Sequence, residues 1–175
     1  HRKGLKDPIT GRYPLDRGTG NYIVALIDSF ELTGKQSYLD RASLVIKNTA
    51  SPTEDLSQRD LGNVEETWFY TVYLQAVCRY IWAKQTSAQL DESYDYAVQV
   101  LVHFAKWMCV NEEPYLSKPE ILEFPNQTWT AQDMRKVNVL LAAAMFSEEA
   151  HKFEKKAVQI RNFVIENLAN SKEKD

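Results

Sequence analysis

Residues 68–82 read WFYTVYLQAVCRYIW, and this stretch decides the fold. Its apolar side chains recur every three or four residues, which is the spacing of an α-helix. They also surround most of the helical cylinder: Trp68, Phe69, Val72, Tyr73, Ala76, Val77, Tyr80 and Ile81. A helix that is apolar on most sides is buried between its neighbours. The stretch therefore predicts a central helix, with Asn63 as its N-terminal cap and Glu65 and Glu66 in its first turn.

Helical periodicity also marks five flanking stretches. The five stretches run over residues 21–32, from Ser37 to the Ser51-Pro52 break, from Asp91 toward Pro114, over 130–145 and over 148–168. Of the six helices, the first, third and fifth are apolar on more sides, whereas the second, fourth and sixth are amphipathic. Short turns pair the six helices as one with two, three with four, and five with six. An aromatic residue precedes an alanine by about one turn in each second member: Tyr38 and Ala42, Tyr94 and Ala97, Phe153 and Ala157. Such repetition indicates an array of hairpins that stack on one another.

The predicted fold is all-α, with three consecutive antiparallel helical hairpins forming a partial (α/α) toroid or an α-solenoid. In that arrangement helices one, three and five form an inner layer, and the others form an outer layer. An unspecific six-helix bundle is the alternative.

Residues 1–175 are expected to form a single helical domain. Residues 1–20 contain Pro8, Gly11, Pro14, Gly18 and Gly20 and predict an irregular lead-in. Residues 113–128 contain three prolines and predict a long surface loop, of the kind that often borders a functional site. An incomplete array exposes the apolar sides of its inner helices. We therefore expect self-association, or a longer chain of which these residues are an excised part.

Composition narrows the classes of partner. The 175 residues carry a net charge of −3 and have a pI near 5.7, so no concentrated basic face for nucleic acid is expected. No run approaches the roughly 18 apolar residues that a membrane span needs. Neither His and Cys pairs at metal-ligand spacing nor a glycine-rich phosphate loop occurs. The sequence therefore predicts no metal and no cofactor.

The candidate site lies where the N-terminal ends of the inner helices meet. The residues expected there are Arg17 and Asn21, then Glu65, Glu66, Trp68 and Tyr70, then Trp129, Gln132, Asp133, Arg135 and Lys136. Trp and Tyr rings offer flat apolar faces to a sugar ring, and carboxylates beside them bond hydroxyls or exchange protons. In this interpretation Trp68, Tyr70 and Trp129 stack on the ligand, and Arg17, Arg135 and Lys136 contact its polar groups.

Two kinds of chemistry remain open for these residues. A glycoside hydrolase needs two carboxyl groups, about 5–5.5 Å apart for retention or about 6.5–9.5 Å for inversion, and Glu65 or Glu66 with Asp133 are the candidates. A polysaccharide lyase needs a base near groups that neutralise a uronate, for which Tyr70, Tyr73 and Arg17 are candidates. The structural alternative is that Glu65 and Glu66 only favour a first helical turn and that Asp133 pairs with a cation.

A family resemblance points in the same direction. Residues 32–42, LTGKQSYLDRA, resemble the hairpin turn of six-hairpin glycosidases, sugar epimerases and the helical domains of heparinase- and alginate-lyase-like enzymes. Residues 17–21, RGTGN, and 128–133, TWTAQD, are similar to the lyase side of that group. The resemblance implies an (α/α) toroid that handles a poly- or oligosaccharide. Family members close five to seven hairpins into a ring, whereas three are expected here.

The sequence thus supports two functional hypotheses. The first is a carbohydrate-active or carbohydrate-binding domain, either a polysaccharide lyase or a glycoside hydrolase if it is an enzyme. The second is a non-catalytic helical-repeat module that binds a protein or another domain of its own chain.

Overall fold

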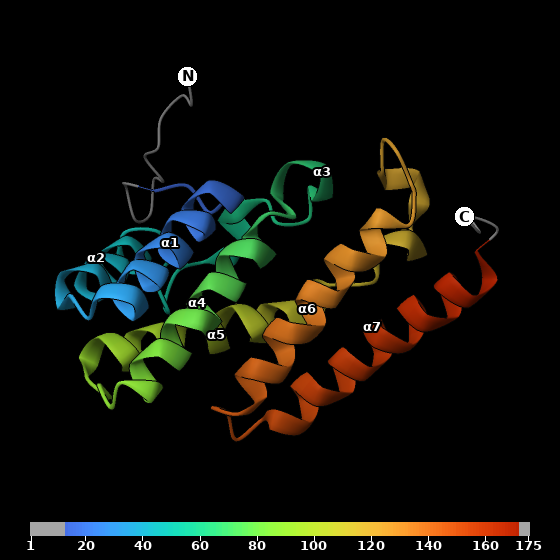
Figure 1. Cartoon of the computed structure of the whole chain (residues 1–175). Helices are drawn as coiled ribbons and strands as arrows, with labels where there is room; N and C mark the ends of the chain where they lie inside the picture. Colours follow the sequence, from blue (N-terminus) through green and yellow to red (C-terminus); the bar gives the residue numbers. More distant parts are fainter. Residues whose placement is uncertain (1–12, 172–175) are drawn as a thin grey trace.

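The computed structural model describes residues 13–171, and this part of the chain contains helices and connections without a strand (Figure 1). The predicted all-α class is confirmed. Six long helices carry the fold: α1 (Arg17–Thr33), α2 (Gln36–Lys47), α4 (Tyr70–Thr86), α5 (Glu92–Asn111), α6 (Thr128–Ala144) and α7 (Ala150–Asn170). The shorter elements are η1 (Leu56–Arg59), α3 (Val64–Thr67), η2 (Tyr115–Ser117) and η3 (Pro119–Ile121).

The long helices form three hairpins, α1 with α2, α4 with α5, and α6 with α7. Helices α1, α4 and α6 contact one another in a row, and α5 contacts both α2 and α7 in a second row. The helix predicted from residues 68–82 lies at the centre of the first row, where Tyr73 and Val77 are fully buried. Tyr73 therefore belongs to the core.

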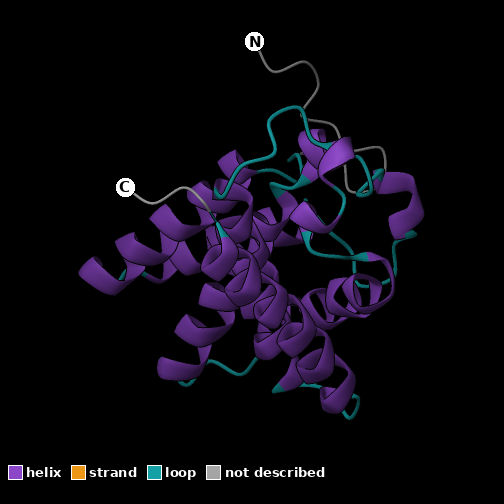
Figure 2. Cartoon of the chain, turned by 90° about the vertical axis from the view of Figure 1, so that its right-hand side faces the viewer, coloured by secondary structure: helices purple, strands orange, loops and turns teal. Residues whose placement is uncertain are grey.

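Long and short connections lie at opposite ends of the hairpins. The turns within the hairpins are short, whereas residues 48–69 and 112–127 link one hairpin to the next. Figure 2 shows these long connections gathered at one end of the molecule. The N-terminal ends of α1, α4 and α6 lie at this same end, because each long connection leads into a helix of the first row.

The observed boundaries differ from the predicted ones in three places. Helix α1 begins at Arg17, so the irregular lead-in is shorter than the predicted 1–20; residues 1–12 lie outside the described range. The early start follows from Asp16, whose carboxylate accepts a hydrogen bond from Thr19 N at 2.8 Å. The predicted 113–128 loop contains η2 and η3, and α6 already begins at Thr128.

The predicted third helix is divided at Trp68 and Phe69. Both residues keep helical backbone angles, but the hydrogen bonds tighten to three-residue spacing, from Thr71 N to Trp68 O at 3.2 Å and from Val72 N to Phe69 O at 3.0 Å. Asn63 precedes the four-residue α3, yet its side chain makes no capping bond. The division turns α3 away from the axis of α4 and places Glu65 beside the 112–127 connection.

None of the described helices combines the length and the apolar character that crossing a membrane requires.

Gly20 sets the distance between α1 and α4. A Cβ atom at this position would lie 3.0 Å from Val72 O and 3.1 Å from Tyr73 Cα, both of which are backbone atoms. Only glycine allows the two helices to approach this closely.

We predict that Gly20→Ala destabilises the protein by about 1–3 kcal/mol, although alanine normally favours a helix, because the backbones must separate. Gly62→Ala is the matched control, since nothing lies within 4 Å of the position that a Cβ atom would take there. It should change the free energy of unfolding by less than about 0.5 kcal/mol. Urea unfolding of both variants measures the difference, and equal stabilities would contradict the close approach.

Candidate functional site

The N-terminal ends of α4 and α6 meet through aromatic side chains. The rings of Trp68 and Trp129 pack edge to face with centroids 6.2 Å apart, and the Tyr115 ring also packs against Trp129, with centroids 5.1 Å apart. Trp129 is only 8% exposed, and its Nε1 donates to Phe124 O at 3.2 Å. The ring predicted to stack on a ligand is thus a packing element beneath the 112–127 connection.

Lys136 is the centre of a buried polar network. Its Nζ atom lies 2.6 Å from Glu112 Oε2 and 3.1 Å from Asp133 Oδ1, and it donates to Glu113 O at 2.7 Å. The Tyr115 ring covers the ammonium group at 3.2 Å from the ring centroid. The three donors of the ammonium group therefore all have acceptors, although the side chain is fully buried.

Tyr70 and the Tyr115 backbone complete the network. The Tyr70 hydroxyl donates a short hydrogen bond to Glu112 Oε1, and Tyr115 N donates to Asp133 Oδ2 at 3.1 Å. The network thereby joins α4, the C-terminal end of α5, the following connection and α6. Tyr70, Asp133 and Lys136 were all predicted site residues, and the structure brings them together.

Burial controls the ionisation of these groups. It raises the pKa of Asp133 to about 6, against the opposing effects of Lys136 and the Tyr115 N–H, while Glu112 raises it further. Burial, together with Glu112, also raises the pKa of Tyr70 well above its ordinary value. Two carboxylates share one ammonium group here, so Asp133 takes up a proton at a higher pH than an ordinary aspartate does.

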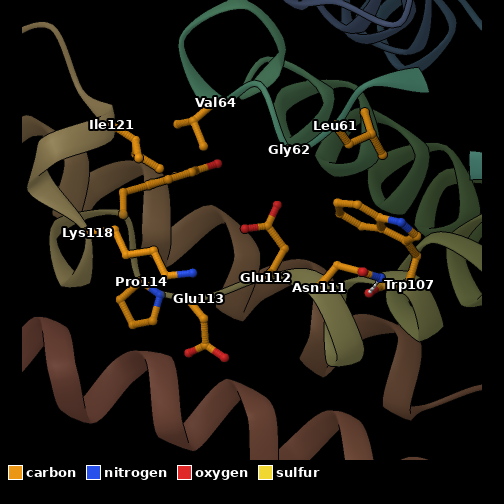
Figure 3. A pocket seen from close by; sticks show the side chains of 11 residues that line it. Leu61, Gly62, Val64, Trp107, Asn111, Glu112, Glu113, Pro114, Lys118 and Ile121 are labelled. Atoms are coloured by element: carbon orange, nitrogen blue, oxygen red, sulfur yellow. Dashed lines mark hydrogen bonds between the residues drawn. The ribbon is translucent and has the colours of Figure 1, made fainter. Parts of the chain in front are cut away.

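A cavity of about 200 Å³ opens beside this network. It lies at the C-terminal end of α5, between residues 61–64 and residues 112–121. Figure 3 shows the Glu112 carboxylate in the middle of the cavity, with Trp107 and Asn111 on one side and Lys118 on the other. Pro114, Ile121, Val64 and Leu61 provide its apolar walls. The cavity thus combines an aromatic ring, charged groups and an amide.

Tyr115 lines this cavity and carries a hydroxyl group that no other described residue satisfies. The side chain is 3% exposed, and its oxygen has no hydrogen-bond partner among the described residues. Burial also raises the pKa of this phenol well above its ordinary value, which keeps it protonated. A buried hydroxyl without a partner costs about 1–3 kcal/mol. Among the residues that line the cavity, Tyr115 therefore carries the buried hydroxyl group that still lacks a hydrogen-bond partner.

The remaining predicted residues lie outside the cavity. Glu65 Oε1 accepts a hydrogen bond from Glu123 N at 2.7 Å, and Arg135 bonds Gln132 at 2.8 Å and Gln75 at 2.5 Å. Arg17 and Asn21 are exposed on α1, where the Arg17 guanidinium lies 5.7 Å from the Phe69 ring centroid. The carboxylate of Asp133 is fully buried, so it and Glu65 do not form an open carboxylate pair.

Sequence reasoning missed Glu112, Tyr115 and Trp107. Glu112-Glu113-Pro114-Tyr115 opens the long connection, which the prolines had marked as a possible border of a site. The sequence signal for these residues is the acidic pair Glu112-Glu113, which lies at the end of the predicted helix and directly before Pro114. Nothing in the spacing showed that Glu112 turns inward toward Lys136 while Glu113 turns outward to Lys156, at 2.9 Å.

Comparisons with protein-family models, with curated proteins and with solved structures found no match.

We predict that Tyr115→Phe leaves the free energy of unfolding unchanged or raises it by about 1 kcal/mol, because the lost hydroxyl has no partner in the protein. Thermal and urea unfolding without ligand measure this effect. Tyr70→Phe is the control, since it removes a hydroxyl that is bonded to Glu112, and it should destabilise by at least about 1 kcal/mol. A larger loss of stability in Tyr115→Phe than in Tyr70→Phe would contradict the finding that the Tyr115 hydroxyl has no hydrogen-bond partner among the described residues.

The raised pKa of Asp133 predicts a pH dependence of stability. The folded state holds this proton more tightly than the unfolded state, so the contribution of Asp133 to stability falls as pH rises from about 4 to 6. The fall amounts to about 3 kcal/mol at most. Asp133→Asn removes this titration, so the stability of the native chain minus that of the variant should decrease across this window. A difference that increases instead would show that the pKa of Asp133 in the folded chain lies below its ordinary value.

Proposed function

We propose that this chain is a carbohydrate-binding domain whose cavity at the C-terminal end of α5 holds one sugar ring, either free or at the end of an oligosaccharide. The observation that carries the proposal is the unpartnered Tyr115 hydroxyl beside the Glu112 carboxylate in a cavity also lined by Trp107. A sugar ring presents hydroxyl groups to Tyr115 and Glu112 and a C–H face to Trp107.

The size of the cavity supports a single ring. Pockets for drug-sized ligands occupy about 300–1,000 Å³. The cavity here is smaller, at about 200 Å³, and is lined by few polar groups around an apolar wall. Asn111 and Lys118 at its two sides offer donors for ring or carboxylate oxygens.

The proposal concerns binding rather than proton transfer. The carboxylates of Glu112 and Asp133 are both held by Lys136, and Tyr70 occupies the other oxygen of Glu112. Of the two, only Glu112 lines the cavity, and these contacts fix its carboxylate there as an acceptor for a sugar hydroxyl. We further propose that the two rows of helices correspond to part of an (α/α) toroid, in which the site lies at the end where the inner helices begin.

A protein-binding role is the second candidate. The last hairpin exposes five large apolar side chains, Leu141, Met145, Val158, Ile165 and Leu168, each at least 45% exposed. Exposed apolar residues on one hairpin favour association with another protein surface.

Calorimetric titration with D-glucose, D-glucuronate and N-acetyl-D-glucosamine tests the sugar proposal. We expect one of them to bind, and Trp107→Leu to weaken its affinity by at least about tenfold, the equivalent of about 1.4 kcal/mol of lost contact. Trp82→Leu is the matched control, because Trp82 is 62% exposed on α4 and does not line this cavity. Circular dichroism confirms that both variants fold.

Binding that survives in Trp107→Leu and is lost in Trp82→Leu would move the site to the open face of α4. The absence of binding to all three sugars would overturn the proposal in favour of the protein-binding role.

A further inference from the structure

Helix α7 has an apolar side that points away from the second hairpin. Lys156 Nζ lies 2.9 Å from Glu113 Oε1, and Gln159 Nε2 donates to Glu113 Oε2 at 3.1 Å. This side of α7 therefore faces the C-terminal end of α5. At 3.6 residues per turn, the large apolar residues on the other side of α7 are Val158, Ile165 and Leu168. Each of these side chains is about half exposed.

Helix α6 exposes apolar side chains in the same direction. Lys136 marks the side of α6 that faces α5, because its ammonium group pairs with Glu112. Met145 follows Lys136 by nine residues, about two and a half helical turns, so it lies on the opposite side, as Leu141 does. Both helices thus turn apolar residues away from α5. We call this surface the end face; its residues are Leu141, Met145, Val158, Ile165 and Leu168.

The helix at the other end of the array is polar on its exposed side. Figure 1 shows the α1–α2 hairpin at one edge of the molecule and the α6–α7 hairpin at the other. The exposed residues of α2 are Gln36, Ser37, Asp40, Arg41 and Leu44. Terminal units of a helical array need such a polar outer face to stay in solution. The end face lacks this polar cover, and α2 offers no matching apolar surface for head-to-tail stacking.

Two opposite charges lie beside the apolar residues of the end face. Glu154 and Arg161 lie about one turn before and after Val158 on the same side of α7, and neither forms an ion pair with another described residue. In a two-fold symmetric pair, each contact occurs twice with the roles exchanged. An axis near Val158 therefore brings Arg161 of each copy beside Glu154 of the other. The same axis sets the Ile165 end of each face against the Met145 end of its copy.

The end face is large enough for a specific contact. The 17 residues of α6 span about 25 Å, and two adjacent helices are together about 20 Å wide. The face therefore covers roughly 500 Å², and two copies bury at least about 1,000 Å² between them. Specific interfaces between proteins begin at about this size.

We propose that the end face binds the end face of a second copy of this chain, which makes the protein a two-fold symmetric dimer through its third hairpins. The apolar residues supply the contact, and the pairs of Glu154 with Arg161 fix its symmetry. None of the end-face residues lines the Glu112 cavity, so this inference does not rest on the proposed sugar binding.

Sedimentation equilibrium of the full chain over a range of concentrations tests the dimer. We expect the mass to rise from 20.2 kDa to twice that value, with a dissociation constant below about 100 µM. Val158→Glu places a charge in the middle of the end face and should weaken association at least about tenfold. Leu44→Glu is the matched control, because Leu44 is similarly exposed but lies on α2, and it should dimerise as the native chain does. Circular dichroism confirms that both variants fold.

A charge exchange tests the symmetry of the pair. Arg161→Glu alone should weaken dimerisation by about threefold, because it sets a carboxylate against Glu154 of the second copy. Adding Glu154→Arg to the same chain should restore the native dissociation constant, since each altered residue again meets an opposite charge.

Three results would overturn the dimer as proposed. The first is a native chain that stays monomeric at about 100 µM. The second is a dimer that Leu44→Glu disrupts, because the first hairpin would then take part in the contact. The third is a double variant that dimerises no better than Arg161→Glu does. Each of them leaves the sugar titration of the Glu112 cavity unaffected.

Discussion

The structure depends on one buried ammonium group. Lys136 binds Glu112 at the end of α5, Asp133 on its own helix and the carbonyl of Glu113 in the connection between them. Without these contacts, the network would contain two buried carboxylates with no cation, at a cost of several kcal/mol for each ion. Lys136 therefore ties the second hairpin to the third at the point where the long connection leaves α5.

The same network shapes the cavity. Because Lys136 holds one carboxylate oxygen of Glu112 and Tyr70 holds the other, this carboxylate is fixed in the middle of the cavity. The Tyr115 ring covers Lys136, which buries the phenol and leaves its hydroxyl without a partner in the described chain. The unpartnered hydroxyl of Tyr115 therefore costs stability.

The sequence predicted the helices far better than the site. Periodicity located the six long helices because burial of an apolar stripe leaves a regular trace, as it does at Tyr73 and Val77. The division at Trp68 left no such trace, since it depends on how Glu65 and Trp68 meet a segment over fifty residues away. A lysine in the run Met134-Arg135-Lys136 has the pattern of a solvated charge, and only the fold reveals its burial.

A crystal structure of the chain with its tightest-binding sugar tests the central claim most directly. The account predicts one ring in the Glu112 cavity, with a ring oxygen or hydroxyl within about 3.2 Å of the Tyr115 hydroxyl and a C–H face against Trp107. A sugar bound elsewhere, with the Tyr115 hydroxyl still unpaired, would contradict it.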